Sequence, residues 1–125
     1  MPKVQLHSLP NRKAAFIEPM ECLPVSKLPE GTQWVWEIKL DGYRAIAVKS
    51  GRLTLFSRRK NSLNTKFPYI VEPLNSLPDN TVVDGELVAI DDNGRPDFHA
   101  LQNFRSAASR VHFYIFDLLC CKGRD

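Results

Sequence analysis

The sequence predicts an α+β fold, in which a mainly antiparallel sheet carries a few short helices. Stretches that alternate apolar and polar residues, or that are continuously apolar, dominate the 125 residues and indicate strands. Turn signals such as Ser50-Gly51 join neighbouring strands within a few residues, which favours antiparallel pairing. Two shorter stretches space their apolar residues as helices do. A chain of this length suits one modest domain or part of a larger one.

Three strands are expected in the first half of the chain. The first covers residues 34–39 and leads through an Asp41-Gly42 turn into a second strand over 44–49. Ser50-Gly51 then turns the chain into a third strand over 52–58. These strands predict an antiparallel meander.

The second half predicts two helices and two further strands. FPYIVEPL predicts a helix with Pro68 in its first turn and Pro73 as a cap or kink. NTVVDGELVAI predicts a strand that ends at a DDNG turn. DFHALQNFRSAAS predicts a short amphipathic helix with Asp97 as its N-cap, and RVHFYIFDLLCC predicts one more buried strand.

Composition narrows the class of protein. The chain is 43% hydrophobic and 25% charged, which is typical of globular rather than disordered proteins. A net charge of +3 permits a nucleic-acid or nucleotide partner without demanding one. The three cysteines are an odd number and form no recognisable metal motif, and no stretch has the character of a secretory signal or membrane span. We therefore expect a reducing, cytoplasmic setting and no membrane partner.

The segment KLDGYR places charged residues within an otherwise apolar stretch. Lys39 can act as a nucleophile if burial or neighbouring cations lower its pKa. Asp41 can orient a hydroxyl or a cation, and Arg44 can bind a phosphate through two hydrogen bonds. From residue types alone, a charged hairpin tip without chemistry is the commoner interpretation.

A basic run follows the third predicted strand. Arg58, Arg59, Lys60 and Lys66 suit phosphate contacts, whose affinity falls as the salt concentration rises. A solvated basic face is the alternative and is more common.

Two carboxylates and one aromatic residue complete the candidate groups. Asp84 and Glu86 share one face of their predicted strand, where they can hold Mg²⁺ or ribose hydroxyls. Their alternative role is to balance nearby arginines. Phe116 can stack on a base, although an aromatic in such a strand is normally part of the core.

The order of these groups resembles the ATP-dependent DNA ligases, within the lysine-dependent nucleotidyltransferase superfamily. KLDGYR fits the KxDGxR signature of that family, and SRRKN, DGELVAI and FYIFDLL follow in the family's order. VVDGELVAIDDNGRPDFHALQ most resembles the ligase domains of bacterial end-joining repair systems. The resemblance covers residues 16–125 and leaves 1–15 as a leader. It implies a partial ATP-grasp-like nucleotidyltransferase domain with roles in DNA repair and recombination.

The resemblance also implies a mechanism and a set of site residues. Lys39 would attack the α-phosphate of ATP and hold AMP as a phosphoramidate, with Mg²⁺ neutralising charge. AMP would then pass to the 5′-phosphate of nicked or broken double-stranded DNA, where a 3′-hydroxyl would displace it. Nucleotide contacts are implied for Glu37, Asp41, Arg44, Arg58, Glu86 and Phe116, with Phe116 stacked on the adenine and Glu86 also helping the metal. DNA contacts are implied for Arg44, Arg58, Arg59 and Lys60.

The sequence departs from the family pattern after FDLL. The second metal-binding glutamate motif and the lysine pair that grips the α-phosphate do not follow it, so we expect the N-terminal portion of an adenylation domain. Without those groups the transferring charge lacks electrostatic stabilisation, and we expect weak activity or none from this chain alone. We also expect self-association through an open sheet edge.

Three other functions stay open at this point. The chain can bind nucleotide or DNA without turnover. It can belong to RNA ligases or mRNA-capping guanylyltransferases, which share KxDGxR. An unrelated α+β domain with coincidental motifs is the last alternative.

Overall fold

A computed structural model describes residues 5–103 and 110–125 of the chain, and its centre is one antiparallel sheet. The strands are β1 (Tyr43–Ser50), β2 (Arg52–Ser57), β3 (Thr81–Ala89) and β4 (Val111–Cys120). They lie in the order β2-β1-β3-β4, and every neighbouring pair is antiparallel. The helices are a 3-10 turn η1 (Leu6–Ser8), α1 (Pro68–Leu74) and α2 (Phe98–Gln102). The expected α+β class is confirmed.

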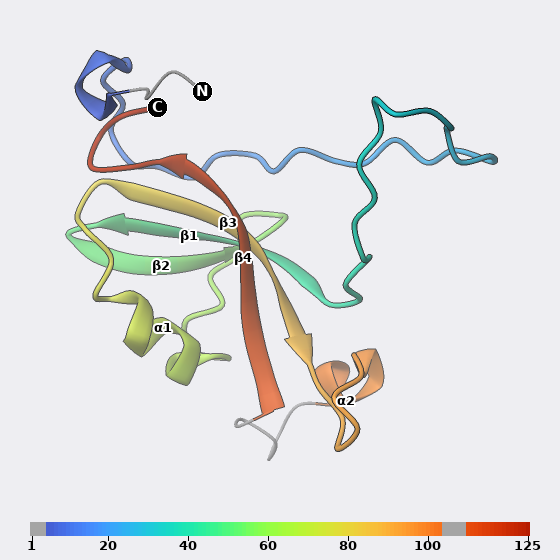
Figure 1. Cartoon of the computed structure of the whole chain (residues 1–125). Helices are drawn as coiled ribbons and strands as arrows, with labels where there is room; N and C mark the ends of the chain where they lie inside the picture. Colours follow the sequence, from blue (N-terminus) through green and yellow to red (C-terminus); the bar gives the residue numbers. More distant parts are fainter. Residues whose placement is uncertain (1–4, 104–109) are drawn as a thin grey trace.

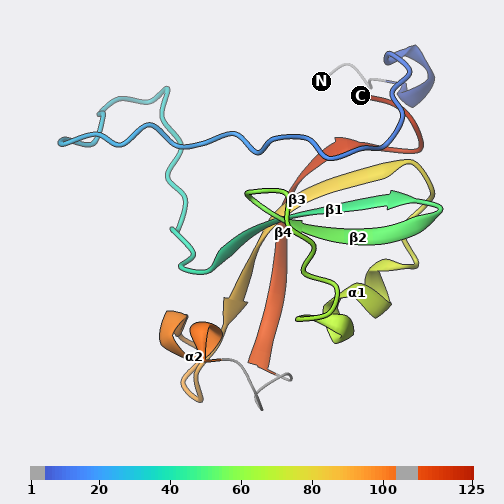
Figure 2. The same ribbon diagram turned by 180° about the vertical axis from the view of Figure 1, so that it is seen from behind.

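Each face of the sheet has its own hydrophobic core. Strand alternation sends Ala45, Ala47 and Val83 to one face, where side chains of α1 such as Ile70 and Val71 pack against them. The opposite face carries Ile46, Val48, Val82 and Cys120, and it is covered by Ala14 near the end of the leader and by Phe16 and Ile17 just after it. Figures 1 and 2 show α1 and the leader on opposite sides of the sheet.

The leader is held in place at the end of the sheet where it meets the C-terminal turn (Figure 1). The backbone N–H of Arg12 donates to the Gly123 carbonyl at 2.8 Å, and that of Asp125 donates to the Pro10 carbonyl at 3.1 Å. Beyond the sheet, the chain between the leader and β1 makes a long excursion without helix or strand (Figures 1 and 2).

The strand expected over 34–39 is wrong. Residues 33–41 have no regular secondary structure, and Trp36 and Ile38 are 62% and 89% exposed. Among the described residues, none forms a ladder with this segment, and β1 pairs on its two sides with β2 and β3 instead. The hairpin expected at Asp41-Gly42 is therefore wrong as well, because the alternating pattern has no strand to pair with.

The last expected strand exists, but it is not buried. Only Val111 and Cys120 at its two ends are buried, whereas Ile115, Phe116 and Leu118 are about half exposed. The physical reason is that β4 is an edge strand, with β3 as its one ladder neighbour among the described residues. Continuous apolarity indicated burial between layers, but neither the leader nor α1 reaches the middle of this strand.

The other predicted elements are confirmed with small shifts at their ends. The expected strands over 44–49 and 52–58 are β1 and β2, joined at Gly51, whose φ of +70° is readily adopted by glycine. Pro68 opens α1, and Pro73 lies one residue before its end. The Asp97 side chain caps α2 by accepting from the Ala100 N–H, and the remainder of that expected helix, 104–109, lies outside the described residues. Within the described ranges, no helix is long and apolar enough to cross a membrane.

Candidate functional site

A cavity of about 630 Å³ opens where β1 begins and β2 ends. Three parts of the chain line it: the start of β1, the loop from the end of β2 toward α1, and one residue of β3. The lining residues are Gly42, Tyr43, Arg44, Ser57, Arg58, Arg59, Asn61, Leu63, Lys66 and Glu86. Four of these side chains are cationic and one is acidic, so the cavity suits an anionic ligand.

Gly42 allows the chain to enter β1 closely packed against β3. A Cβ atom at this position would lie 1.9 Å from the Leu87 carbonyl oxygen, a distance that no side chain tolerates. The Gly42 N–H also donates a hydrogen bond to the Glu86 carboxylate. Glycine is therefore needed here for close approach of two backbones, rather than for the tight turn that the sequence predicted.

Arg44 and Asp84 form a largely buried ion pair across β1 and β3. Both hydrogen bonds of the pair, from the Arg44 Nε and Nη2 atoms to the two Asp84 carboxylate oxygens, measure 2.6 Å. The side chains are 22% and 4% exposed, so each charge needs the other to offset its lost hydration. The guanidinium also lies 5.0 Å from the ring centroid of Phe116. The alternative considered for Asp84, an acid that balances an arginine, describes its environment in the structure.

Glu86 is half-buried on the cavity wall and belongs to the same face of β3 as Asp84. Burial raises the pKa of its carboxyl, and the charges of Arg44 and Lys39 together with the Gly42 N–H oppose that rise. The protonation state of Glu86 therefore depends on the cations that lie near its carboxylate.

Lys39 lies outside the lining of the cavity, on the exposed segment before it. Its Nζ atom donates to the Asp41 carboxylate at 2.7 Å, and its side chain is 86% exposed. The hydrogen bond and charge of Asp41 raise the pKa of Lys39 above its ordinary value. The condition set for a nucleophilic Lys39, burial or neighbouring cations that lower its pKa, is therefore not met in this structure, because the strand expected over 34–39 does not form.

The cavity brings together part of the set that the sequence predicted. Arg44, Arg58, Arg59 and Glu86 line it, whereas Glu37, Lys39, Asp41, Lys60 and Phe116 do not. Arg58 pairs with Glu21 of the excursion at 3.2 Å, and the Lys60 Nζ lies 5.7 Å from the Phe16 ring centroid.

Sequence reasoning missed several of the lining residues. Three uncharged lining residues stand inside the quoted motifs, Tyr43 in KLDGYR and Ser57 and Asn61 in SRRKN, but no role was assigned to them. Leu63 follows just after SRRKN. Lys66 was seen as part of a basic run but not as a site residue. The sequence signal that could have identified Tyr43 is its position between Gly42 and Arg44 at the start of a strand.

A metal ion would need donors from outside the protein at this site. Within the described ranges, no group of three or more His, Cys, Asp or Glu side chains is placed to hold a metal. Asp84 is engaged by Arg44, so Glu86 is the carboxylate that faces the cavity. One carboxylate fits Mg²⁺, which commonly takes one or two protein carboxylates and completes its shell with phosphate oxygens and water.

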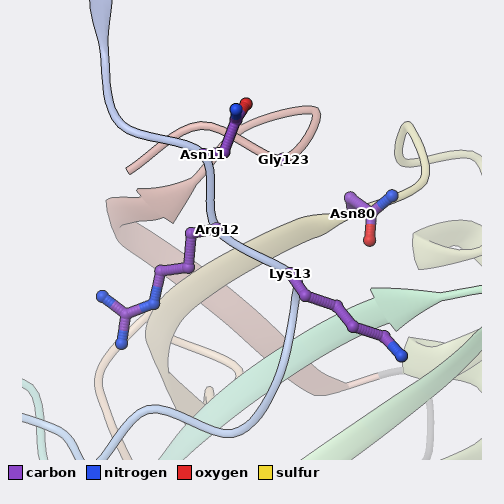
Figure 3. Close-up of a pocket in the computed structure, with 5 residues that line it drawn as sticks. All are labelled: Asn11, Arg12, Lys13, Asn80 and Gly123. Atoms are coloured by element: carbon purple, nitrogen blue, oxygen red, sulfur yellow. The ribbon is translucent and has the colours of Figure 1, made fainter.

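A second cavity, of about 390 Å³, lies where the leader meets the C-terminal turn. Figure 3 shows the side chains of Arg12 and Lys13 pointing in different directions from the leader, with Asn80 on the loop before β3. Arg12 pairs with Asp125, and the Gly123 N–H donates to the Asn80 carbonyl at 2.8 Å. These contacts fix the leader to the sheet, and the diverging side chains do not form a converging set of ligands.

Comparison with known proteins gives matches over most of the chain. The model of the ATP dependent DNA ligase domain family matches residues 19–125. The multifunctional non-homologous end joining protein LigD of Pseudomonas aeruginosa is 34% identical over 114 residues, which cover 88% of this chain and 14% of that protein. The SPbeta prophage-derived DNA ligase-like protein LigB of Bacillus subtilis is 30% identical, over 88% of this chain and 42% of the relative.

Solved structures agree with these matches. The crystal structure of the ligase domain from Mycobacterium tuberculosis LigD aligns with a TM-score of 0.60 at 35% identity, covering 70% of this chain and 30% of that chain. A mycobacterial DNA ligase D complexed with ATP and MES gives the same values. The chain thus spans less than a fifth of the P. aeruginosa LigD and under a third of the solved ligase domain. The match from residue 19 to 125, the shared sheet and the ordered motifs together show that this chain belongs to the ATP-dependent DNA ligase domain family.

Proposed function

We propose that this chain takes part in ATP-dependent DNA ligation and that Lys39 accepts AMP in the first step. One observation carries the proposal: a single short segment, KLDGYR, supplies both an exposed amine and the first residues of the cationic cavity. Gly42 and Arg44 line that cavity, and Lys39 lies close enough to Glu86 for their charges to interact. A nucleotide whose phosphates enter the cavity would have its α-phosphate near the amine.

The proposed step is the transfer of an adenylyl group (AMP) from ATP to nitrogen. Lys39 first loses a proton to solvent, and its neutral Nζ then forms a bond to the α-phosphorus of ATP. The bond between that phosphorus and the bridging oxygen breaks, and pyrophosphate leaves. AMP stays on Lys39 as a phosphoramidate, and the positive charge of the lining arginines stabilises the phosphate oxygens meanwhile.

Nucleotide and metal have separate roles in this proposal. ATP is the nucleotide found with a mycobacterial DNA ligase D, and we assign it to this chain by that likeness. Mg²⁺ held by Glu86 and the nucleotide phosphates would supply charge neutralisation during the transfer. Arg44 and Arg58 would contact phosphate or ribose, Phe116 would stack on the adenine, and Glu37 and Asp41 would contact the nucleotide from the segment around Lys39.

Nicked or broken double-stranded DNA is the proposed second substrate. AMP would pass to a 5′-phosphate, and the adjoining 3′-hydroxyl would displace it to close the strand. Arg44, Arg58, Arg59 and Lys60 would contact the DNA. Residues 16–125 would form the N-terminal portion of the adenylation domain, with 1–15 as a leader.

Binding without turnover is the second candidate, and the state of Lys39 favours it. Its ammonium is paired with Asp41, and the raised pKa keeps the amine protonated at neutral pH. A protonated lysine is not a nucleophile. This candidate predicts nucleotide or DNA binding with no covalent product.

Label transfer separates the two candidates. The chain is incubated with ATP or GTP labelled at the α-phosphate, then denatured and tested for bound label, beside a Lys39→Ala variant. We expect slow labelling by ATP in the wild type and none in the variant. Labelling by GTP in preference to ATP would instead assign the chain to the capping guanylyltransferases. No labelling, from chain shown to be folded, would favour binding without turnover.

We also propose that two copies of the chain associate through β4. The outer edge of this strand has no ladder partner among the described residues, and Ile115, Phe116 and Leu118 are exposed along it. A second copy presents the same edge, so pairing of the two β4 strands is self-complementary. Light scattering tests this: we expect a dimer in the wild type and a monomer for Ile115→Lys, and a monodisperse wild-type monomer would contradict it.

A further inference from the structure

Lys66 stands out among the exposed lysines because aromatic rings hold it at the wall of the cationic cavity. Its Nζ lies 5.0 Å from the ring centroid of Tyr43 and 5.5 Å from that of Phe67. Phe67 is fully buried, and Tyr43 is the first residue of β1, paired with Leu87 of β3. The Tyr43 ring also packs edge-on against Phe98, with centroids 5.7 Å apart. Two rings anchored in the fold therefore restrict where the ammonium can go.

The charge of Lys66 has no acidic partner in the described part of the chain. Of the four cations that line the cavity, Arg44 pairs with Asp84 and Arg58 pairs with Glu21. Lys66 and Arg59 take part in none of the ion pairs between described residues. The acid on the wall, Glu86, interacts with Arg44 and Lys39. The wall near Lys66 thus has positive charge that the protein itself does not offset.

We propose that Lys66 is a phosphate-binding residue of this site and that Tyr43 is its positioning residue. The inference rests on the proposed function, because it takes the cavity as the place where nucleotide and DNA meet. The ligand is a phosphate group, which a lysine ammonium binds as a point charge. Two sources can supply it: the phosphodiester backbone of DNA, or the polyphosphate tail of ATP.

The salt dependence of DNA binding tests the first source. Each phosphate contact on duplex DNA contributes about −0.9 to the slope of log K against log salt concentration. We expect Lys66→Gln to make the slope for a nicked duplex with a 5′-phosphate less negative by about that amount. Lys27→Gln is the matched control, because Lys27 is exposed in the excursion and far along the chain from the cavity-lining residues, and its slope should equal that of the wild type.

Tyr43 variants separate positioning from folding. Tyr43→Phe keeps the ring and should keep the wild-type slope. Tyr43→Leu removes the ring and should reproduce the slope of Lys66→Gln, with its melting curve recorded to show that it is folded. If Tyr43→Leu is unfolded, Tyr43→Phe and Lys66→Gln still carry the test.

Binding of ATP and AMP tests the second source. If Lys66 holds the polyphosphate tail, Lys66→Gln weakens ATP binding and leaves AMP binding unchanged, while the DNA slope stays that of the wild type. Either a DNA effect or an ATP effect supports a phosphate site at Lys66. A variant that matches the wild type with DNA and with ATP overturns this inference alone. A wild-type chain that binds neither ligand overturns the proposed function together with it.

Discussion

At the scale of single residues, the Arg44–Asp84 pair is the strongest link between the stability of the sheet and the cavity. Asp84 is almost wholly buried, and its two carboxylate oxygens are both occupied by one guanidinium. The pair holds the Arg44 side chain close to the Phe116 ring. Its loss should therefore affect both folding and the cavity.

We predict that Asp84→Ala lowers the free energy of unfolding by up to about 3 kcal/mol. This value is the low end of the cost of breaking a buried ion pair, because the Arg44 side chain remains partly exposed. Urea unfolding gives the value. Asp92→Ala is the matched control, because it removes an acid from an exposed pair with Arg110 and should cost at most about 1 kcal/mol. Equal effects of the two substitutions would contradict the role assigned to Asp84.

Glu86 should make stability depend on pH. Because burial raises the pKa of its carboxyl, the folded state favours the protonated form. The resulting stabilisation is complete below the ordinary carboxyl pKa and is lost as the pH rises through the raised value. We predict that Glu86→Gln gains stability relative to the wild type between about pH 4 and 7. Urea unfolding at both pH values, with Glu72→Gln on α1 as control, measures this. A stability difference that is constant over this range would count against it.

Residue types alone could identify the candidate groups but not their partners. The same-face spacing of Asp84 and Glu86 was predictable from strand alternation. Which acid would be neutralised depended on the register of β1 against β3, where Arg44 lies opposite Glu86 and yet bonds to Asp84. A register of this kind involves residues some 40 positions apart and cannot be derived from local pattern.

At the scale of elements, the entry into β1 depends on a missing side chain. We predict that Gly42→Ala destabilises the fold by about 1–3 kcal/mol, the usual cost of forcing extra atoms into a packed site, since the new Cβ would collide with the Leu87 carbonyl. Gly51→Asn is the control: its φ of +70° is tolerated by asparagine, and nothing lies within 4 Å of the added Cβ. Thermal unfolding of both variants measures the difference in stability between them. A small loss of stability in Gly42→Ala would show that the backbones at Gly42 and Leu87 can move apart.

The segment before β1 should behave as exposed chain. Trp34 and Trp36 are 50% and 62% exposed, and they are the two tryptophans of the sequence. We predict fluorescence emission typical of hydrated indole and efficient quenching by acrylamide. Blue-shifted and protected emission would mean that this segment is packed as a strand, as its alternating pattern first suggested.

The hairpin of β1 and β2 was predictable from local pattern, whereas the fate of residues 34–39 and the burial of β4 were not. β1 and β2 meet through one glycine turn, so period and turn chemistry together fix them. The alternating pattern over 34–39 and the continuous apolar run of β4 show only which side chains are apolar. Whether a strand forms, and how deeply it is buried, depends on which surfaces cover it.

At the scale of the whole molecule, charge and topology place a cationic cavity beside an exposed lysine. The sheet supplies Arg44 and Glu86, the loop before α1 supplies further cations, and the leader closes the opposite face. The family could be predicted from four ordered motifs, and the α+β class from the strand and helix patterns. The exposure of Lys39 outside the cavity lining could not, because it follows from the unpaired segment that carries the lysine.

Covalent attachment of AMP should accelerate with pH. Asp41 raises the pKa of Lys39, so the neutral amine is scarce at neutral pH. We predict that the rate of attachment rises about tenfold per pH unit between about pH 7 and 9, as expected for an unprotonated nucleophile. A rate that is flat over this range would show that another group, or another state of Lys39, is the acceptor.

Intact-mass spectrometry after incubation with ATP and Mg²⁺, beside Lys39→Ala, tests the central claim most directly. We predict that a small fraction of the wild type, growing with pH, gains the mass of one adenylyl group, and that peptide mapping places it on Lys39. The variant should gain nothing. No gain in a folded wild type at any pH, or an equal gain in Lys39→Ala, would contradict the assignment of Lys39 as the residue that accepts AMP.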